Sequence, residues 1–451
     1  MNGIFDTPWG NALKLEQKVQ HICARQERYG WLFDKETAIT RLQALHDMRN
    51  KIDEEVMPRL PLRVIPGIEM AKPFKKDGAL AKRVTEYTDA AVSGPFTKLS
   101  FEPMNLGSVA QVKEFLFTIG WQPDEWNHDD DGNKTSPKLS ESSLERLDHP
   151  LGKHIAQREV VKHRIGLLAG LIENVRADGR IPSRINTLGA ATHRATHSVI
   201  VNLPKAGEDK QGNPIAFYGQ EIRSLFIAPA GCTLVGGDAK GLQLRCLAHY
   251  INNPDFTKEV IAGDPHQGNW DVLEELCPTR PIAKNLLYCL IFGGQDPKLA
   301  TTAGFNGSDK KLRMIGGEIR SRLVGRVPGF LELTQGVQAA AKTRGYLLGP
   351  DGRKVWLRSA HAALNTLLQH MEAFIMKLAM CFLYDMIEEA RIHAEQLTWQ
   401  HDEFVHEVED QAVDVVVDMY DRCIPMAGEF MGSNCPLETN TQKGVSWATV
   451  H

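Results

Sequence analysis

Two aspartates far apart in the chain, Asp238 and Asp402, are the first candidates for chemistry in this sequence. Asp238 follows the apolar segment 233–237, which predicts a strand, and Asp402 lies within the alternating segment 398–408, which predicts a hairpin. Two carboxylates on neighbouring sheet elements could hold two magnesium ions, which activate an attacking hydroxyl and neutralise a leaving oxygen. Acids at strand ends and in turns are also common as solvated groups, so position alone leaves both interpretations open.

A second group of candidates lies between these two acids. Arg280, Lys284, Tyr288 and Phe292 recur at intervals of four, which places them on one face of a predicted helix. Two cations followed by two aromatic rings could meet a triphosphate and then a sugar and a base. An ordinary amphipathic helix with a solvated basic end explains the same spacing equally well.

The elements that must position these residues are mostly helices. Helical spacing extends over 15–57, 152–177 and most of 235–390, whereas strands are predicted only in short and widely separated segments. The sequence therefore predicts an α+β fold in which a small sheet is assembled from distant parts of the chain.

The composition is that of a globular protein with a sizeable core. The chain has 451 residues, of which 42% are hydrophobic and 24% charged, and its formal net charge is −4. Because the chain is not basic overall, it must meet any polyanion through local patches. We recognise no secretory signal and no bilayer-spanning segment, and the eight dispersed cysteines form no CxxC pair. These features predict an intracellular protein with reduced thiols and neither a zinc site nor a disulfide framework.

Three segments, in this order, carry a resemblance to family A DNA polymerases. Residues 237–245 (GDAKGLQLR) resemble the first palm motif of that family, 280–293 its fingers-helix motif, and 401–403 (HDE) its third motif. The supporting matches are 192–197 with 202–204, 221–226, and 352–369. The last of these, together with 245–249, is most similar to the replicative polymerases of small T-odd-type tailed phages.

The resemblance implies a right-hand polymerase fold, with a helical thumb and fingers and a palm containing a small antiparallel sheet. The thumb and its connection to the palm would span 14–174, the first part of the palm 175–250, the fingers 251–359, and the second part of the palm 360–451. The phage relatives carry an N-terminal proofreading exonuclease, and we expect this chain to lack it.

The implied function is template-directed addition of dNTPs to a primer 3′ end by two-metal nucleotidyl transfer, with two Mg²⁺ ions as cofactors. Asp238, the Ala239 carbonyl and Asp402 would hold the metals, Glu403 would support them, and Lys284 would be the general acid for departing pyrophosphate. The residues expected to bind the nucleotide are Arg280, Lys284, Tyr288, His266, Gln243 and Phe292. The residues expected to contact the DNA are Arg194, Arg223, His361, Asn365, Gln369 and His401.

Two positions depart from the family pattern. Gln243 stands where the family usually has glutamate and Phe292 where it usually has tyrosine, and we interpret them as one coupled change. The segment 58–97 lies where the phage relatives carry a thioredoxin-recruiting insertion, but it is shorter, so we do not expect thioredoxin as a partner. The expected partners are primer-template DNA and dNTPs. A separate exonuclease or processivity subunit is a further candidate partner, and no membrane is expected. The expected location is the cytoplasm, that of a bacterial host if the chain is phage-encoded.

Two other function classes fit part of the sequence. A two-metal nuclease would use the paired aspartates, but it would not need the Arg280–Lys284–Tyr288 face. A non-catalytic DNA-binding subunit would use the basic stretches, but it would not be expected to retain Asp238 and Asp402.

Overall fold

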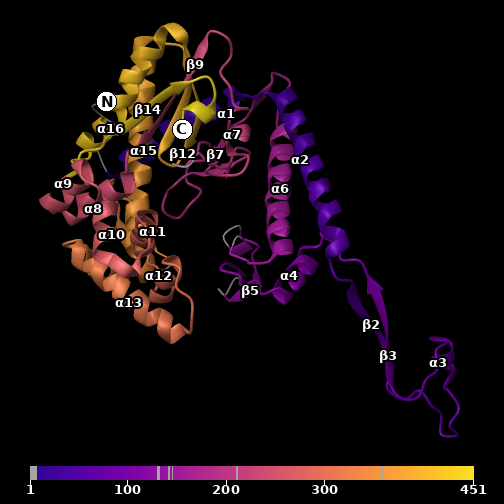
Figure 1. The fold of residues 1–451 in the computed structure, drawn as a ribbon. Helices are drawn as coiled ribbons and strands as arrows, with labels where there is room; N and C mark the ends of the chain where they lie inside the picture. Colours follow the sequence, from indigo (N-terminus) through magenta and orange to yellow (C-terminus); the bar gives the residue numbers. More distant parts are fainter. Residues whose placement is uncertain are drawn as a thin grey trace. The chain divides into compact units, whose positions relative to one another are not determined.

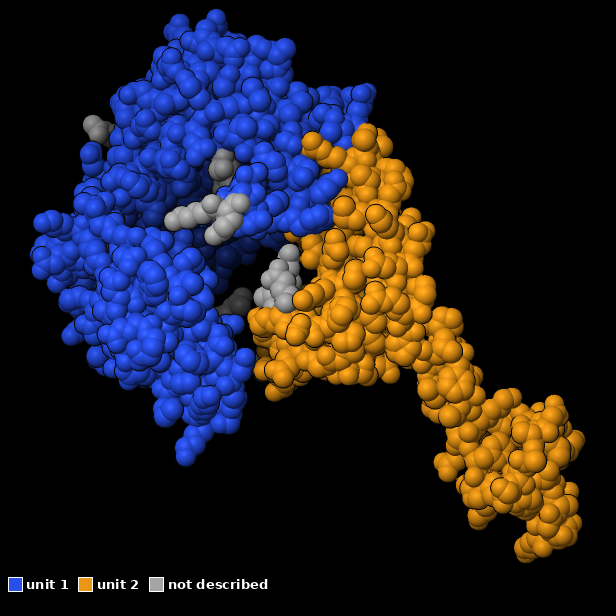
Figure 2. All heavy atoms as spheres, in the orientation of Figure 1, with its two compact units in different colours: residues 1–38, 170–451 blue, residues 39–169 orange. Residues whose placement is uncertain are grey.

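The computed structural model describes residues 8–129, 133–140, 143–144, 146–209, 212–357 and 359–450. The chain forms two compact units (Figure 2). The larger combines Met1–Ala38 with Gly170–His451, and the smaller is Ile39–Ala169.

The larger unit is built on a four-stranded antiparallel sheet with the order β12-β13-β9-β14 (Figure 1). The strands are β9 (Cys232–Ala239), β12 (Ala394–Gln400), β13 (Glu403–Glu409) and β14 (Thr439–Gly444). In the register of the sheet, Asp238 lies between Glu403 and Asn440. A Cβ atom on Gly237 would lie 2.5 Å from the ring of Tyr420, so only glycine allows this close approach before Asp238.

The core helix of the larger unit is α15 (Ala363–Ala390), against which α1 (Pro8–Tyr29) and α16 (Val413–Phe430) pack. Among the described residues, Ala360–Ala390 is the one helix that is long and apolar enough to cross a membrane, but 94% of its most apolar window is buried inside the protein. Leu15 and Val19 of α1 belong to the same core as α15. Residues 14–38, which fall in the range predicted for the thumb and its connection to the palm, lie in the larger unit, because the apolar face of α1 is buried there.

A run of helices connects β9 to α15. It comprises α8 (Leu242–Ile251), α9 (Pro254–Ala262), α10 (Pro265–Leu273), α11 (Arg280–Ile291), α12 (Asp296–Thr302), α13 (Asp309–Arg326) and α14 (Phe330–Arg344). The side chains of Asn253 and Asp264 accept hydrogen bonds from the first turns of α9 and α10, and a proline follows each of them. These local signals fix where both helices begin.

Short elements complete the larger unit. They are β1 (Trp31–Leu32), β6 (Arg180–Ile181), β7 (Arg184–Asn186), β8 (Thr196–Ser198), α7 (Gly219–Arg223), β10 (Tyr346–Leu348), β11 (Lys354–Trp356) and the 3₁₀ turn η5 (Trp447–Thr449). Each of the pairs β1–β6, β7–β8 and β10–β11 is antiparallel.

The smaller unit is held by most of α2 (Lys35–Val56) and α6 (Pro150–Glu173), whose side chains Asp53 and Arg158 form an ion pair. Arg158 also donates to the Leu106 carbonyl oxygen at 2.8 Å. The remaining elements are β2 (Arg63–Met70), α3 (Lys82–Thr85), β3 (Phe96–Glu102), α4 (Val109–Thr118), β4 (Trp126–His128) and β5 (Lys134–Pro137).

Candidate functional site

A pocket of about 630 Å³ lies in the larger unit, where the end of β9 meets the β12–β13 turn and α11. It gathers residues from segments far apart in the chain. Its polar lining residues are Arg194, Lys205, Asp238, Gln243, Lys284, Tyr288, Glu372, His401, Asp402 and Glu403. Both predicted metal-binding aspartates and part of the predicted nucleotide-binding helix therefore face one space.

The backbone of the sheet holds the two aspartates together. The Ala239 N–H donates to the Asp402 carbonyl oxygen at 2.9 Å, which ties the end of β9 to the hairpin turn. The Asn440 side chain donates to Asp238 Oδ1 at 3.0 Å. Desolvation raises the pKa of Asp402, and the nearby Asp238 and Glu403 carboxylates raise it further. The site thus concentrates negative charge that a divalent cation would offset.

The donor set fits a hard divalent cation. Asp238 and Asp402 supply carboxylate oxygens, and Ala239 belongs to the same pocket lining. Within the described parts of the chain, no group of three or more His, Cys, Asp or Glu side chains is placed to enclose a metal ion. Magnesium commonly takes only one or two carboxylates and completes its shell with water and substrate phosphates, so a two-carboxylate site suits this ion.

Glu403 is buried beside this pair and is engaged by the protein core. Its Oε1 accepts a hydrogen bond of 2.9 Å from Trp447 Nε1, and Trp447 is fully buried in η5. No local pattern singles out Trp447, because its partner Glu403 lies 44 positions earlier in the chain.

Arg223 differs from its predicted role as a DNA contact. The residue is only 6% exposed, its Nε donates to the Pro204 carbonyl oxygen at 2.9 Å, and its guanidinium lies 4.7 Å over the Trp447 ring. Burial lowers its pKa. Its guanidinium stacks on the tryptophan that binds Glu403, so it is packed in the protein interior rather than exposed.

Helix α11 brings Lys284 and Tyr288 to the pocket. Lys284 Nζ lies 6.0 Å from the centre of the Tyr288 ring. Burial raises the pKa of Tyr288, and the Glu372 and Asp402 carboxylates add to this shift, so its hydroxyl is neutral at pH 7. Phe292 caps the C-terminal end of α11, 47% exposed, with its ring 6.2 Å from that of Tyr288.

Arg280, the first residue of α11, is paired with Asp264. Its Nε and Nη2 atoms each donate to a different Asp264 oxygen at 2.8 Å, and this contact lowers the pKa of Asp264 to about 2. His266 follows on α10, with its ring 6.0 Å from that of Tyr288. Burial and the Lys284 and Arg280 cations lower the pKa of His266 to about 4, so its imidazole is neutral at pH 7.

Some of the residues predicted to contact DNA line the pocket, and others lie outside its lining. Arg194 and His401 line the pocket, and burial lowers the pKa of His401 to about 4. His361 lies just before α15 and contacts the Gly293 carbonyl oxygen. Asn365 and Gln369 follow it along α15, half-buried and outside the pocket lining.

Glu372 is a pocket residue that sequence reasoning missed. It is 6% exposed, and Arg194 Nη2 lies 3.1 Å from its Oε2. Burial, together with the Asp402 charge, raises its pKa to about 7 despite the opposing effect of Arg194. The signal that could have found it is a single acid within the apolar stretch 371–376 of a predicted core helix.

Fold and site together define a nucleotidyltransferase with the right-hand polymerase fold. The chain belongs to DNA polymerase family A, because the model of the family described by that name matches residues 79–449. It is a DNA-directed DNA polymerase, and a polymerase of this family uses divalent metal ions.

Three known proteins illustrate this membership. The DNA-directed DNA polymerase of Escherichia phage Phieco32 is 25% identical, with 97% of this chain and 98% of that protein aligned. That of Escherichia phage T7 is 27% identical, over 99% of this chain and 71% of that protein. The solved POL domain of Pol1 from M. smegmatis, in complex with DNA primer-template and dNTP, has a TM-score of 0.72 at 20% identity, covering 96% of this chain and 70% of that one. The likeness to the solved structure shows the fold.

Proposed function

We propose that this polymerase extends a primer 3′ end with dNTPs, using the pocket that joins Asp238 and Asp402 to Lys284 and Tyr288. The observation that carries the proposal is this single space, in which paired carboxylates face a cation and an aromatic ring of α11. Two magnesium ions bound by Asp238, Asp402 and the Ala239 carbonyl would activate the primer hydroxyl and neutralise the leaving oxygen.

The other residues of the site bind and orient the substrates. Arg280, Lys284 and His266 bind the triphosphate, and Lys284 donates a proton to departing pyrophosphate. Tyr288 lies against the sugar and base of the incoming nucleotide.

The duplex is held from the minor-groove side. Arg194, together with His361, Asn365, Gln369 and His401, faces the primer end. Acceptors occur at every base pair in that groove, so donors there test pairing geometry without reading sequence.

The parts of the hand follow from these roles. The sheet with α15 and α16 is the palm, α9 to α14 are the fingers, and Ile39–Ala169 is the thumb. The partners are primer-template DNA and dNTPs, and the place of action is the cytoplasm of a bacterial host, as the phage relatives suggest.

One assay separates this proposal from the two other function classes. A labelled primer annealed to a longer template is incubated with the full chain, magnesium and four dNTPs. Lengthening of the primer by nucleotides complementary to the template supports the polymerase. Shortening would indicate a nuclease, and retention of an unchanged duplex would indicate a non-catalytic DNA-binding subunit.

Asp264 is expected to oppose nucleotide binding, because its carboxylate occupies the Nε and Nη2 donors of Arg280 before a triphosphate arrives. Asp264→Asn removes the competing charge but keeps a side-chain oxygen for the first turn of α10. We expect the KM for dNTPs to fall about threefold with kcat nearly unchanged, as expected for an exposed ion pair worth about 0.2–1 kcal/mol. A higher KM in steady-state primer extension would show instead that the pair orients Arg280 for binding.

Gln243 is expected to exclude ribonucleotides by occupying the space beneath the nucleotide sugar. It lines the pocket half-buried, and no hydrogen bond of its side chain to a described residue is found. Gln243→Ala should raise ribonucleotide incorporation relative to dNTP incorporation by about tenfold or more, measured as a ratio of kcat/KM values. Unchanged sugar discrimination would refute this role.

The coupling of Gln243 with Phe292 is tested by a double-mutant cycle. Gln243→Glu alone should impair dNTP incorporation, because a partly buried carboxylate would lack a donor near the triphosphate. Adding Phe292→Tyr should restore much of the rate, with an interaction of about 1 kcal/mol. Strict additivity of the two changes would refute the pairing.

A further inference from the structure

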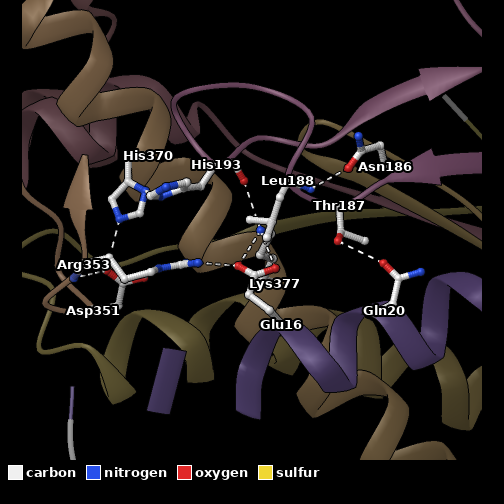
Figure 3. Close-up of polar contacts among 10 residues, drawn as sticks. All are labelled: Glu16, Gln20, Asn186, Thr187, Leu188, His193, Asp351, Arg353, His370 and Lys377. Atoms are coloured by element: carbon white, nitrogen blue, oxygen red, sulfur yellow. Dashed lines mark hydrogen bonds and ion pairs between the residues drawn. The ribbon is translucent and has the colours of Figure 1, made fainter. Parts of the chain in front are cut away.

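A chain of hydrogen-bonded side chains in the larger unit begins and ends at His193 (Figure 3). Lys377 of α15 is fully buried and donates to the His193 carbonyl oxygen at 3.0 Å. The same ammonium donates to both carboxylate oxygens of Glu16, at 2.7 and 2.8 Å. Arg353 donates to this carboxylate at 2.6 Å, so Glu16 links the two cations.

The chain closes through Asp351 and His370. Asp351 accepts from Arg353 Nε at 2.5 Å and from His370 Nε2 at 3.1 Å. The His370 Nδ1 atom lies 3.0 Å from His193 Nδ1 (Figure 3). Burial and the surrounding positive groups lower the pKa of His193 to about 4, so its ring is neutral at pH 7. His193 is therefore held twice, by its carbonyl oxygen and by its ring.

The residue held in this way has an unfavourable backbone. His193 has φ of 60°, in the left-handed region that a residue other than glycine seldom adopts. Such a conformation costs free energy and persists where the surroundings impose it. The closed ring of side chains supplies that constraint, and the next residue is Arg194.

Arg194 is held from a second side by Glu372. Both residues line the pocket, and their Nη2 and Oε2 atoms are 3.1 Å apart. The Glu372 Oε1 atom is buried without a hydrogen-bond partner among the described residues, so this carboxylate is engaged by little besides Arg194. Glu372 Oε2 engages one edge of the guanidinium and leaves its remaining N–H groups as directional donors.

We propose that His193 and Glu372 are positioning residues, which fix the direction of the Arg194 guanidinium so that it tests the base pair at the primer end. The inference rests on the proposed minor-groove contact of Arg194. It adds that discrimination against a mismatched primer end depends on the hydrogen-bonded ring at His193 and on the carboxylate of Glu372.

The test compares extension from matched and mismatched primer ends, with kcat and KM measured for each. Arg194→Ala defines the full loss, expected to be about tenfold or more in discrimination because hydrogen bonds from a charged donor are removed. His193→Gly suits the left-handed backbone but breaks the closed hydrogen-bond network at the His193 side chain. Glu372→Gln keeps the shape of the side chain but removes its charge. Both should lose about threefold or more in discrimination, mainly through slower extension of matched ends, which lose the hydrogen bonds from Arg194. Glu388→Gln, on the same helix and paired with Arg25 in α1, is the matched control and should behave as the wild type.

The variants are then combined with Arg194→Ala. If His193 and Glu372 act through Arg194, neither His193→Gly nor Glu372→Gln should change discrimination further in that background. Equal losses with and without Arg194 would overturn the inference, as would a change in Tm with discrimination intact. If Arg194→Ala itself leaves discrimination unchanged, the proposed contact of Arg194 fails and the inference fails with it.

Discussion

Asp238→Asn and Asp402→Asn should each lower the kcat of primer extension by about a thousandfold or more, equivalent to about 4 kcal/mol of transition-state stabilisation. Asparagine keeps the size of the side chain and a carbonyl oxygen, so the sheet and turn should form normally. The loss therefore isolates the charge that a divalent cation needs. Both carboxylates face the same pocket, so neither is expected to replace the other.

Duplex affinity separates a metal defect from a folding defect. Primer-template binding should change little in either variant, because contacts to the DNA phosphate backbone depend on cationic side chains elsewhere. Fluorescence anisotropy over a range of salt concentrations measures this binding. Asp414→Asn is the matched control, since Asp414 is an exposed acid of α16 that pairs with Lys443 of β14. Retention of a tenth of the wild-type kcat in either active-site variant would contradict the metal assignment.

The elements that carry the site could be predicted from local sequence. The strand expected before Asp238 is β9, the expected hairpin around Asp402 is β12–β13, and the expected helix from Arg280 is α11. Each has a short-range signal: an apolar run, alternation around a polar turn, or four-residue spacing after a helix start. Such signals act within one element and need no knowledge of its neighbours.

What surrounds those elements could not be predicted in the same way. Arg223 carries the positive charge expected of a DNA contact. In the structure it stacks on Trp447, a residue more than two hundred positions later. Residues of α1 fall in the range predicted for the thumb and its connection to the palm, and their apolar face is buried with α15, which local spacing does not reveal. Glu372 lines the pocket beside Arg194, a residue of a distant part of the chain. In each case long-range packing decides the role.

Lys284→Ala should lower kcat by about 10²–10³-fold, because it removes both a phosphate contact and a proton donor for pyrophosphate. Lys284 projects from the middle of α11 into the pocket and approaches the Tyr288 ring to 6.0 Å. Lys298→Ala, on the following helix α12 and outside the pocket lining, is the matched control and should leave kcat unchanged.

Lys284→Arg distinguishes the two roles of this side chain. Arginine keeps the positive charge but holds its proton far more tightly, so it can bind a triphosphate without acting as an efficient acid. The variant should therefore keep a KM for dNTPs close to that of the wild type and retain the low kcat of Lys284→Ala. A kcat restored to the wild-type level would show that charge alone is required at this position. In that case, a proton donor other than Lys284 would protonate the departing pyrophosphate.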